Sequence, residues 1–397
     1  MKCPIILIAE TMGRKQGGAE IYLANLAEFL AQSGHPVRVY LRSPCSEVMA
    51  PGVDVQVVPV WRSAGFLREW QFARGVRRRL RADGRPVLST LPLPGITHYQ
   101  PHSGLYRAAY EAKRESLDAG FRKKFYRLGI RLNLKRRWLI SMQEKLLTRE
   151  PRPQIMAFSR KLRDEMLHTY RVPASDILSL PLGVDLDQFR PGPPPAHASH
   201  PTSDGKRLML LFAGHNFRLK GLHCLLTALS RASQRGLQAE LLVVGGERRA
   251  EFQKMAGRLG LAARVHFLGF VKDADMADYY RASDVLVHPT FSDHCSLVVL
   301  EALACGRPVI TTCQNGAVEL IEAGRQGIIL PDPYDLEAMV DALLSMQDRR
   351  KLADMGNAAA ALRPRLDFTH HARQVLAWLT ETRPAKSPLG HATARPH

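Results

Sequence analysis

The stretch HPTFSDHCSLVVLEALACGRPVITTCQNG, residues 288–316, decides the fold of this chain. Its apolar and polar positions predict the end of one strand, a polar loop, a helix over residues 297–305 and a second strand over residues 307–312. Units of this length are typical of a parallel sheet covered by helices. Seven residues separate Asp293 in the loop from Glu301 in the helix, so both carboxylates can face one crevice.

The beginning of that helix is a predicted anion site, because its first backbone amides have no partner within the helix. The candidate residues for binding a phosphate group there are Ser296, Leu297 and Val298. A carboxylate deeper in the helix, such as Glu301, can then accept hydrogen bonds from the diol of a ribose. The plainer alternative is that Asp293 and Glu301 only begin and flank a surface helix.

The segment resembles the acidic signature of retaining glycosyltransferases of family 4, in which two acids separated by seven residues contact a nucleotide sugar. The resemblance implies that Asp293 binds hydroxyls of the donor sugar and that Glu301 binds the ribose. This chain has an aspartate where the family usually has glutamate, and Cys295 and Ser296 where it usually has Phe-Gly. Residues 92–191 resemble in particular the lipopolysaccharide core glucosyltransferases, bacterial enzymes that add glucose to an inner-core heptose.

Both halves of the chain alternate short apolar strands with helices, which predicts parallel, doubly wound sheets. The second half has expected strands at 208–213, 240–244 and 265–268, with helices at 221–234 and 250–260 between them. The first half begins with a strand at 4–9, a helix at 19–33 and a strand at 37–41. The resemblance implies the GT-B architecture, an α/β fold in which two Rossmann-like domains face each other across a cleft.

The expected domain boundary lies in a segment rich in proline, histidine and serine, residues 193–205. The first domain, expected to bind the acceptor and to carry a basic membrane-facing insertion, covers residues 1–186, and a linker covers 187–206. The second domain, expected to bind the nucleotide sugar, covers residues 207–366. Residues 367–382 are predicted to form a helix that crosses back to the first domain, and 383–397 a disordered tail.

Gly17 and Gly18 follow the first expected strand and resemble the glycine pair of the family. Glycines at this position let a donor phosphate and an acceptor approach the backbone without a β-carbon in the way. The alternative is that the two glycines only make this loop flexible.

Residues 214–221 follow the first strand of the second domain and are predicted to hold a diphosphate. Gly214 begins the loop, Arg218 would bind phosphate as a planar fork, and Lys220 as a compact charge. The family carries an arginine and a lysine here. Because His215 occupies the usual arginine position, Arg218 is the expected substitute. The alternative is that Arg218 and Lys220 are two surface cations near a loop and do not bind phosphate.

Two histidines compete for a place beside the donor sugar, because a family histidine follows the corresponding strand. His102 in the sequence Gln-Pro-His-Ser-Gly fits that pattern better than His98. An imidazole at the carboxyl end of a strand faces the ligand crevice of an open α/β sheet. Backbone groups at Val271 are predicted to contact the nucleobase.

The composition is that of a globular protein of two domains, since 397 residues are 45% hydrophobic and 23% charged. The apolar runs are too short to span a membrane, and the N-terminus lacks the pattern of a signal peptide. Six dispersed cysteines suit a reducing cytoplasm. The absence of a carboxylate triad or histidine cluster predicts no metal, and no cofactor besides the donor substrate is expected.

The net charge of +19 is the outlier and is concentrated in the first half. Basic and aromatic residues are interleaved between Asp118 and Glu144, and seven arginines lie between Arg68 and Arg85. These stretches can face anionic lipid headgroups, with plain solvation as the alternative. Nucleic acid would be attracted by the same charge, but no nucleic-acid-binding motif is present and none is expected as a partner.

These observations predict a retaining glycosyltransferase that transfers a hexose from a nucleotide sugar to a lipid-linked glycan at the inner face of the cell membrane. For the core-glucosyltransferase branch the resemblance implies UDP-glucose as donor and the lipopolysaccharide core as acceptor. Another glycolipid or an exopolysaccharide is the nearest alternative acceptor. A nucleotide-sugar epimerase would explain the nucleotide site alone, and a non-enzymatic membrane-binding protein only the charge.

Overall fold

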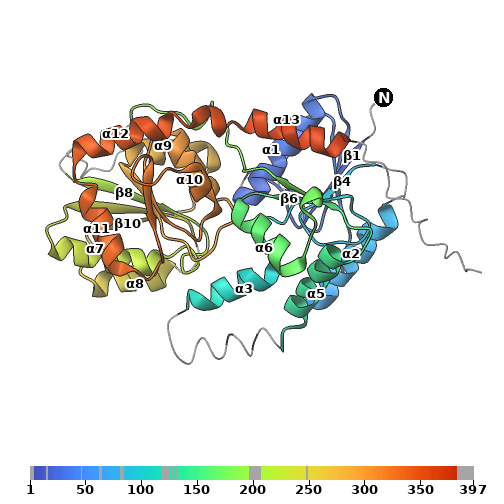
Figure 1. Ribbon diagram of the computed structural model, residues 1–397, viewed down its shortest axis with the longest axis horizontal. Coiled ribbons are helices and arrows are strands. Elements are labelled where there is room, and N and C mark those ends of the chain that lie inside the picture. The colour runs from blue at the N-terminus through green and yellow to red at the C-terminus, as the bar shows by residue number, and fades with distance from the viewer. Residues whose placement is uncertain are drawn as a thin grey trace, which may run out of the picture.

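The computed structural model describes residues 4–14, 17–45, 47–61, 65–80, 85–117, 126, 129, 132–195, 207–246 and 249–381. The chain folds into two α/β domains, each built on a parallel sheet (Figure 1). The predicted architecture of two doubly wound domains is therefore confirmed.

The N-terminal domain contains a seven-stranded sheet with the order β3-β2-β1-β4-β5-β6-β7. The strands are β1 (Ile5–Ala9), β2 (Val37–Leu41), β3 (Val53–Val57), β4 (Val87–Ser89), β5 (His98–Tyr99), β6 (Gln154–Ala157) and β7 (Ile177–Ser179). The helices of this domain are α1 (Gly18–Gln32), α2 (Phe66–Arg79), α3 (Tyr106–Glu115), α5 (Leu134–Thr148) and α6 (Arg160–Tyr170).

The C-terminal domain contains a six-stranded sheet with the order β10-β9-β8-β11-β12-β13. The strands are β8 (Leu208–Ala213), β9 (Ala239–Val244), β10 (Val265–Gly269), β11 (Val285–His288), β12 (Val309–Thr312) and β13 (Gly327–Leu330). The helices are α7 (Leu222–Gln234), α8 (Arg249–Arg258), α9 (Asp273–Ala282), α10 (Leu297–Ala304), α11 (Leu336–Ser345) and α12 (Arg349–Ala360).

The central strands explain why both sheets are parallel and covered on both faces. Every residue of β1 and of β8 is buried, and their sequences IILIA and LMLLFA are wholly apolar. Strands buried on both sides need helices on both faces, which crossover connections between parallel strands supply. In each sheet the strand order reverses beside the first strand, between β1 and β4 and between β8 and β11. Ligands of open α/β sheets bind at the carboxyl ends of strands at such points.

The last described helix, α13 (Phe368–Thr380), lies on the N-terminal domain, where Figure 1 shows it beside α1. The side chain of Asp367 accepts hydrogen bonds from the amides of Thr369 and His370 and so caps the helix. Further along, Nε2 of His371 is 2.9 Å from the Tyr22 hydroxyl in α1. The end of the chain thus joins the two domains.

Several predictions fall on residues that the structure does not describe. In the basic insertion, residues 118–125, 127–128 and 130–131 lie outside the described residues. The same holds for residues 196–206 of the linker and for the tail 383–397. Within the described part of the chain, no helix has both the length and the apolar composition needed to cross a membrane.

Candidate active site

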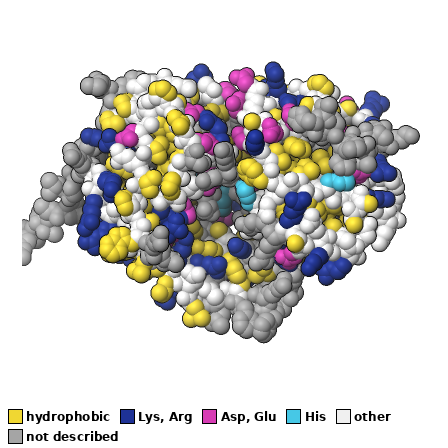
Figure 2. Space-filling view, turned by 180° about the vertical axis from the view of Figure 1, so that it is seen from behind, with side chains coloured by type: hydrophobic (Ala, Val, Ile, Leu, Met, Phe, Trp, Pro, Cys, Tyr) yellow, Lys and Arg dark blue, Asp and Glu magenta, His cyan; other side chains and the backbone are white. Residues whose placement is uncertain are grey.

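The beginning of α1 and the loops that follow β8 and β11 meet between the domains around a cavity of about 290 Å³. Figure 2 shows histidine side chains in the hollow between the two domains. The cavity lies at the switch point of the C-terminal sheet, where the fold class places ligands. Its lining residues are Gly18, Ala19, His102, Phe158, Leu182, Ala213, Gly214, His215, Asn216, Lys220, His288, Asp293, His294, Cys295, Ser296, Leu297 and Val298.

A partly buried ion pair forms one wall of this cavity. The ammonium of Lys220 lies 2.5 Å from a carboxylate oxygen of Asp293, and Nε2 of His288 lies 3.6 Å from the same oxygen. Burial alone would raise the pKa of Asp293, but Lys220 and His288 together hold that pKa well below its usual range. Burial also lowers the pKa of His288. Asp293 is therefore an ionised acceptor for hydroxyl groups, beside a cation that can bind phosphate.

The first turn of α10 forms the adjoining wall. Ser296 precedes the helix, and its hydroxyl lies 3.3 Å from Nε2 of His288. Among the described residues, no group accepts a hydrogen bond from the amides of Leu297 and Val298. These amides carry the positive end of the helix dipole, so the cavity is suited to an anion next to Lys220.

Glycines from both domains leave room for neighbouring side chains here. A β-carbon at Gly18 would lie 2.9 Å from Cδ1 of Leu297 in the other domain, and one at Gly214 would lie 3.1 Å from Cγ of Lys220. Gly17 precedes α1, and a β-carbon there would lie 3.8 Å from Cδ2 of His215. The predicted glycine loops therefore border the cavity from both domains.

A second cavity of about 120 Å³ adjoins the first and shares several lining residues with it. It brings together the predicted Val271 and Glu301. Its lining residues are Arg14, Gly18, Ile21, Ala213, Gly214, His215, Val244, Gly245, Phe270, Val271, Asp273, Met276, Leu297, Val298 and Glu301.

The carboxyl group of Glu301 accepts a hydrogen bond of 2.7 Å from the hydroxyl of Tyr280 in α9. Burial raises the pKa of Glu301 to about 8, the Tyr280 bond lowers it, and the nearby Asp273 charge adds to the rise. Burial also raises the pKa of Tyr280 well above its usual value, so its hydroxyl stays a donor. Glu301 is thus mainly protonated at neutral pH in this structure, and a protonated carboxyl both donates and accepts.

The structure separates the two candidate histidines. His102 lines the cavity between Tyr22 and Phe158, whose rings lie 5.0 and 4.8 Å from its own. Burial lowers the pKa of His102 to about 3, with the neighbouring His371 contributing, so the imidazole is neutral. His98 instead stacks edge-on against Trp378 of α13 at 4.5 Å and does not line the cavity.

The structure does not bring Arg218 into the cavity with Lys220, and its role as a phosphate ligand stays a prediction. Nε of Arg218 donates to Glu251 of α8 at 3.2 Å, and both line a separate cavity. The physical reason is the turn that the loop makes, in which the Lys220 amide bonds to the Asn216 carbonyl at 2.9 Å. In such a helical turn, side chains two positions apart diverge by about 200°. His215 takes the cavity position instead.

Sequence reasoning missed three polar side chains that the structure brings to the site: His288, Asn216 and Tyr280. His288 is the last residue of β11, so the strand-end rule that favours His102 would also have found it. Asn216 lies in the loop after β8, as Lys220 does. Tyr280 lies in α9 and reaches Glu301 only through the packing of α9 on α10, for which the sequence offers no local signal.

Within the described residues, no group of three or more histidine, cysteine, aspartate or glutamate side chains is arranged to hold a metal ion. The chemistry that this site can perform with its own groups is anion binding by Lys220 and the α10 amides, and hydroxyl binding by Asp293 and Glu301.

Two family models match successive parts of the chain. The model described as Glycosyltransferase Family 4 matches residues 16–188, and the model described as Glycosyl transferases group 1 matches residues 196–362. The chain is a GT-B glycosyltransferase. The two matched regions of this glycosyltransferase correspond to its N-terminal and C-terminal domains.

Known proteins resemble the GT-B glycosyltransferase over most of its length. D-inositol 3-phosphate glycosyltransferase 2 of Catenulispora acidiphila is 28% identical, over 86% of this chain and 85% of that protein. The crystal structure of WaaG, a glycosyltransferase involved in lipopolysaccharide biosynthesis, has a TM-score of 0.78 and 22% identity, covering 95% of this chain and 100% of WaaG. HepE from Anabaena in complex with UDP-glucose has a TM-score of 0.68 and 18% identity, covering 95% and 99%. The name of this curated relative differs from the lipopolysaccharide core glucosyltransferases that the sequence of residues 92–191 predicts.

Proposed function

We propose that this glycosyltransferase transfers a hexose, with glucose from UDP-glucose as the expected donor, to a lipid-linked glycan such as the lipopolysaccharide core. The observation that carries the proposal is the contact between Lys220 and Asp293 beside the first turn of α10. An anion site and an ionised hydroxyl acceptor are the two groups that a sugar diphosphate requires. The adjoining cavity with Glu301 and Val271 would hold the nucleoside.

The charges of the site suit the departure of a nucleoside diphosphate. Breaking the bond between the anomeric carbon and the phosphate oxygen leaves negative charge on the diphosphate and positive charge on the sugar. The Lys220 ammonium and the amides of Leu297 and Val298 would stabilise the diphosphate in the transition state, because they are already in place. Asp293 would bind hydroxyls of the sugar and fix its orientation.

The transfer is proposed to retain the configuration at the anomeric carbon. The acceptor hydroxyl would attack from the face that the diphosphate leaves, and its proton would pass to the departing phosphate oxygen. This route needs no protein nucleophile. The neutral imidazole of His102 would orient a sugar hydroxyl rather than supply a charge.

The acceptor and the cellular location are proposed from the N-terminal domain. The high positive charge and the exposed Trp61, Leu67 and Trp70 favour an anionic membrane surface, so a peripheral enzyme at the cytoplasmic face is expected. The likeness to WaaG in fold supports a lipopolysaccharide acceptor. The curated relative supports a second candidate, transfer to a phosphorylated inositol, because its name specifies that acceptor.

The test is the release of nucleoside diphosphate across a panel of nucleotide sugars, with a lipopolysaccharide core glycolipid and with inositol 3-phosphate as acceptors. Lys220→Ala and Glu301→Ala are compared with Lys351→Ala, a surface lysine of α12. Turnover with one donor and the glycolipid, lost in the first two variants only, is the expected result. Turnover with inositol 3-phosphate alone would show that a phosphorylated inositol, and not the glycolipid, is the acceptor. An isomerised sugar without transfer would indicate an epimerase, and no nucleotide binding by calorimetry would refute the proposal.

A further inference from the structure

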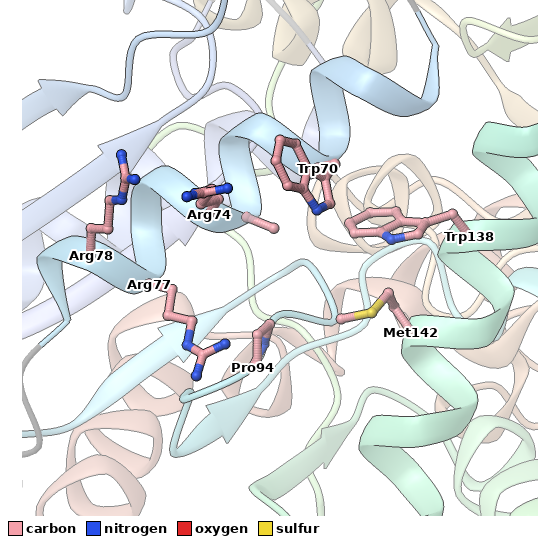
Figure 3. Close-up of a pocket in the computed structure, with 8 residues that line it drawn as sticks. Trp70, Arg74, Arg77, Arg78, Pro94, Trp138 and Met142 are labelled. Carbon is pink, nitrogen blue, oxygen red and sulfur yellow. The ribbon is translucent and has the colours of Figure 1, made fainter.

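A groove of about 690 Å³ lies on the N-terminal domain between α2 and α5, and it shares no lining residue with the candidate active site (Figure 3). Its walls combine three arginines with apolar side chains. The residues that form them are Trp70, Ala73, Arg74, Arg77, Arg78, Pro94, Trp138 and Met142.

The three arginines carry positive charge that no described carboxylate neutralises. Across the ranges that the structure describes, no acidic side chain lies within ion-pair distance of Arg74, Arg77 or Arg78. The one acid of α2, Glu69, is buried under the helix and is already paired with Arg42 and with Lys135, the latter at 2.7 Å.

The apolar part of the groove comes from both helices, with Trp70 on α2 and with Trp138 and Met142 on α5. Figure 3 shows Trp70 of α2 facing Trp138 of α5, with Met142 one turn further along α5 and Arg77 extending from α2 toward Pro94. The Arg74 guanidinium lies 5.3 Å from the centre of the Trp70 ring. Trp70 is 42% exposed although it is a large aromatic side chain.

More exposed apolar side chains continue from the groove at the beginnings of both helices. Leu67 precedes Trp70 in α2, and Leu132 and Leu134 lie where α5 begins, with exposed fractions of 54%, 71% and 62%. The two helix beginnings are joined by Phe66 and Trp138, whose rings meet edge to face at 6.0 Å. An apolar patch beside unpaired cations is the surface expected of a protein that meets an anionic lipid layer.

We infer that this groove binds the headgroup of one anionic phospholipid. The arginines of α2 contact the phosphate, and Trp70, Trp138 and Met142 contact the glycerol and the first part of the acyl chains. Guanidinium groups bind phosphate in a planar, two-bonded geometry, and tryptophan suits the boundary between polar and apolar layers. The inference deepens the proposed membrane association and rests on it, and it would hold the active-site cleft at the surface where a lipid-linked acceptor lies.

The test is calorimetric titration of the full chain with dihexanoyl phosphatidylglycerol below its micelle concentration. One saturable site per chain is expected, absent with dihexanoyl phosphatidylcholine and with inorganic phosphate. The triple variant Arg74→Gln, Arg77→Gln, Arg78→Gln should weaken binding by about tenfold or more, because each basic residue contributes to the attraction of anionic lipid. The matched control removes three surface charges of the C-terminal domain, Lys254→Gln, Arg350→Gln and Lys351→Gln, and should bind as the parent does.

Equal loss in both triple variants would show attraction by net charge only and would overturn the inference. Equal binding of inorganic phosphate would overturn it in favour of a free-anion site, and displacement of the lipid by a short oligonucleotide would overturn it in favour of nucleic acid. The Trp138→Leu variant provides a second test, since it should weaken lipid binding without a change in charge. UDP binding separates this inference from the proposed function, because Lys220→Ala should lose UDP binding and keep the lipid, whereas the α2 variant should do the reverse.

Discussion

The imidazole of His294 in the C-terminal domain lies directly against Gly104 in the N-terminal domain. A β-carbon at Gly104 would be only 1.7 Å from Nε2 of His294, and the backbone there has a φ of +66°. Because the neighbouring Asp293 lines the candidate active site, the contact also positions that loop. Gly104→Ala should force the domains apart and lower kcat/KM by about tenfold or more.

Gly236→Ala is the matched control for this prediction, because Gly236 has a similar φ of +93° and open space around its β-carbon position. Both substitutions carry a backbone strain of about 1 kcal/mol, but only the first has a steric conflict between domains. Steady-state kinetics and small-angle scattering measure the two effects. Equal losses of activity in the two variants would show that strain, and not the His294 contact, is responsible.

Removal of the Lys220 charge should abolish most of the transfer activity. For Lys220→Ala we expect a fall in kcat of about 10²- to 10³-fold, because one preorganised charge at the leaving group is lost. Lys220→Arg should lose less activity, since a cation remains at this position. Lys351→Ala, on the surface, should keep the activity of the parent. An unchanged kcat in Lys220→Ala would show that Lys220 does not stabilise the leaving diphosphate, whatever the effect of the substitution on stability.

The raised pKa of Glu301 predicts a specific dependence of stability on pH. Burial holds the folded-state pKa of Glu301 at about 8, above its ordinary value of 4.5, so the stabilising contribution is complete below pH 4.5 and is lost as pH rises through about 8. Relative to Glu301→Gln, which cannot ionise, the wild type should therefore lose stability between pH 5 and 9, by at most about 1.4 kcal/mol per pH unit. Urea unfolding at each pH measures the difference. If the stability of the two proteins changed with pH in parallel, the pKa of Glu301 would not be raised in the folded protein.

The placement of Arg218 predicts that it is dispensable for donor binding. Arg218→Ala breaks the contact with Glu251 but leaves the cavity intact, so the affinity for UDP should change by less than about threefold. His215→Ala changes a residue that lines both cavities and should weaken UDP binding more. Calorimetry with UDP compares the two. The reverse order would restore Arg218 as a phosphate ligand.

The two histidines should separate into one that affects the reaction and one that affects stability. His102→Gln should lower kcat by about 10²-fold, and the pH profile of the parent should show no step near 6.5 from His102, because burial keeps this imidazole neutral. His98→Ala should instead lower the melting temperature, since its Nε2 lies 3.2 Å from the Trp378 carbonyl and its ring packs on that side chain. A kinetic defect confined to His98→Ala would reverse the assignment.

The parts of the site that could be predicted are those for which the signal is local. Lys220 lies in the loop after an apolar strand, and Leu297 begins a helix. Asp293 was selected by its seven-residue separation from Glu301, which resembles the family signature. Arg218 could not be placed by such a rule. It lies in the same loop as Lys220, but the direction of its side chain depends on how the backbone winds and on Glu251, which is 33 residues away.

The sequence by itself determined the two parallel sheets, their strands and the carboxylates at their edge, because hydrophobic periodicity and helix beginnings act over a few residues. Only the tertiary structure decided which of the polar groups meet. The choice between His98 and His102 depended on α13, which arrives from the far end of the chain, and the pKa of Glu301 depended on burial between helices. The meeting of Gly104 with His294 depended on the approach of two domains. Such contacts arise from packing between distant segments, and no pattern within one segment encodes them.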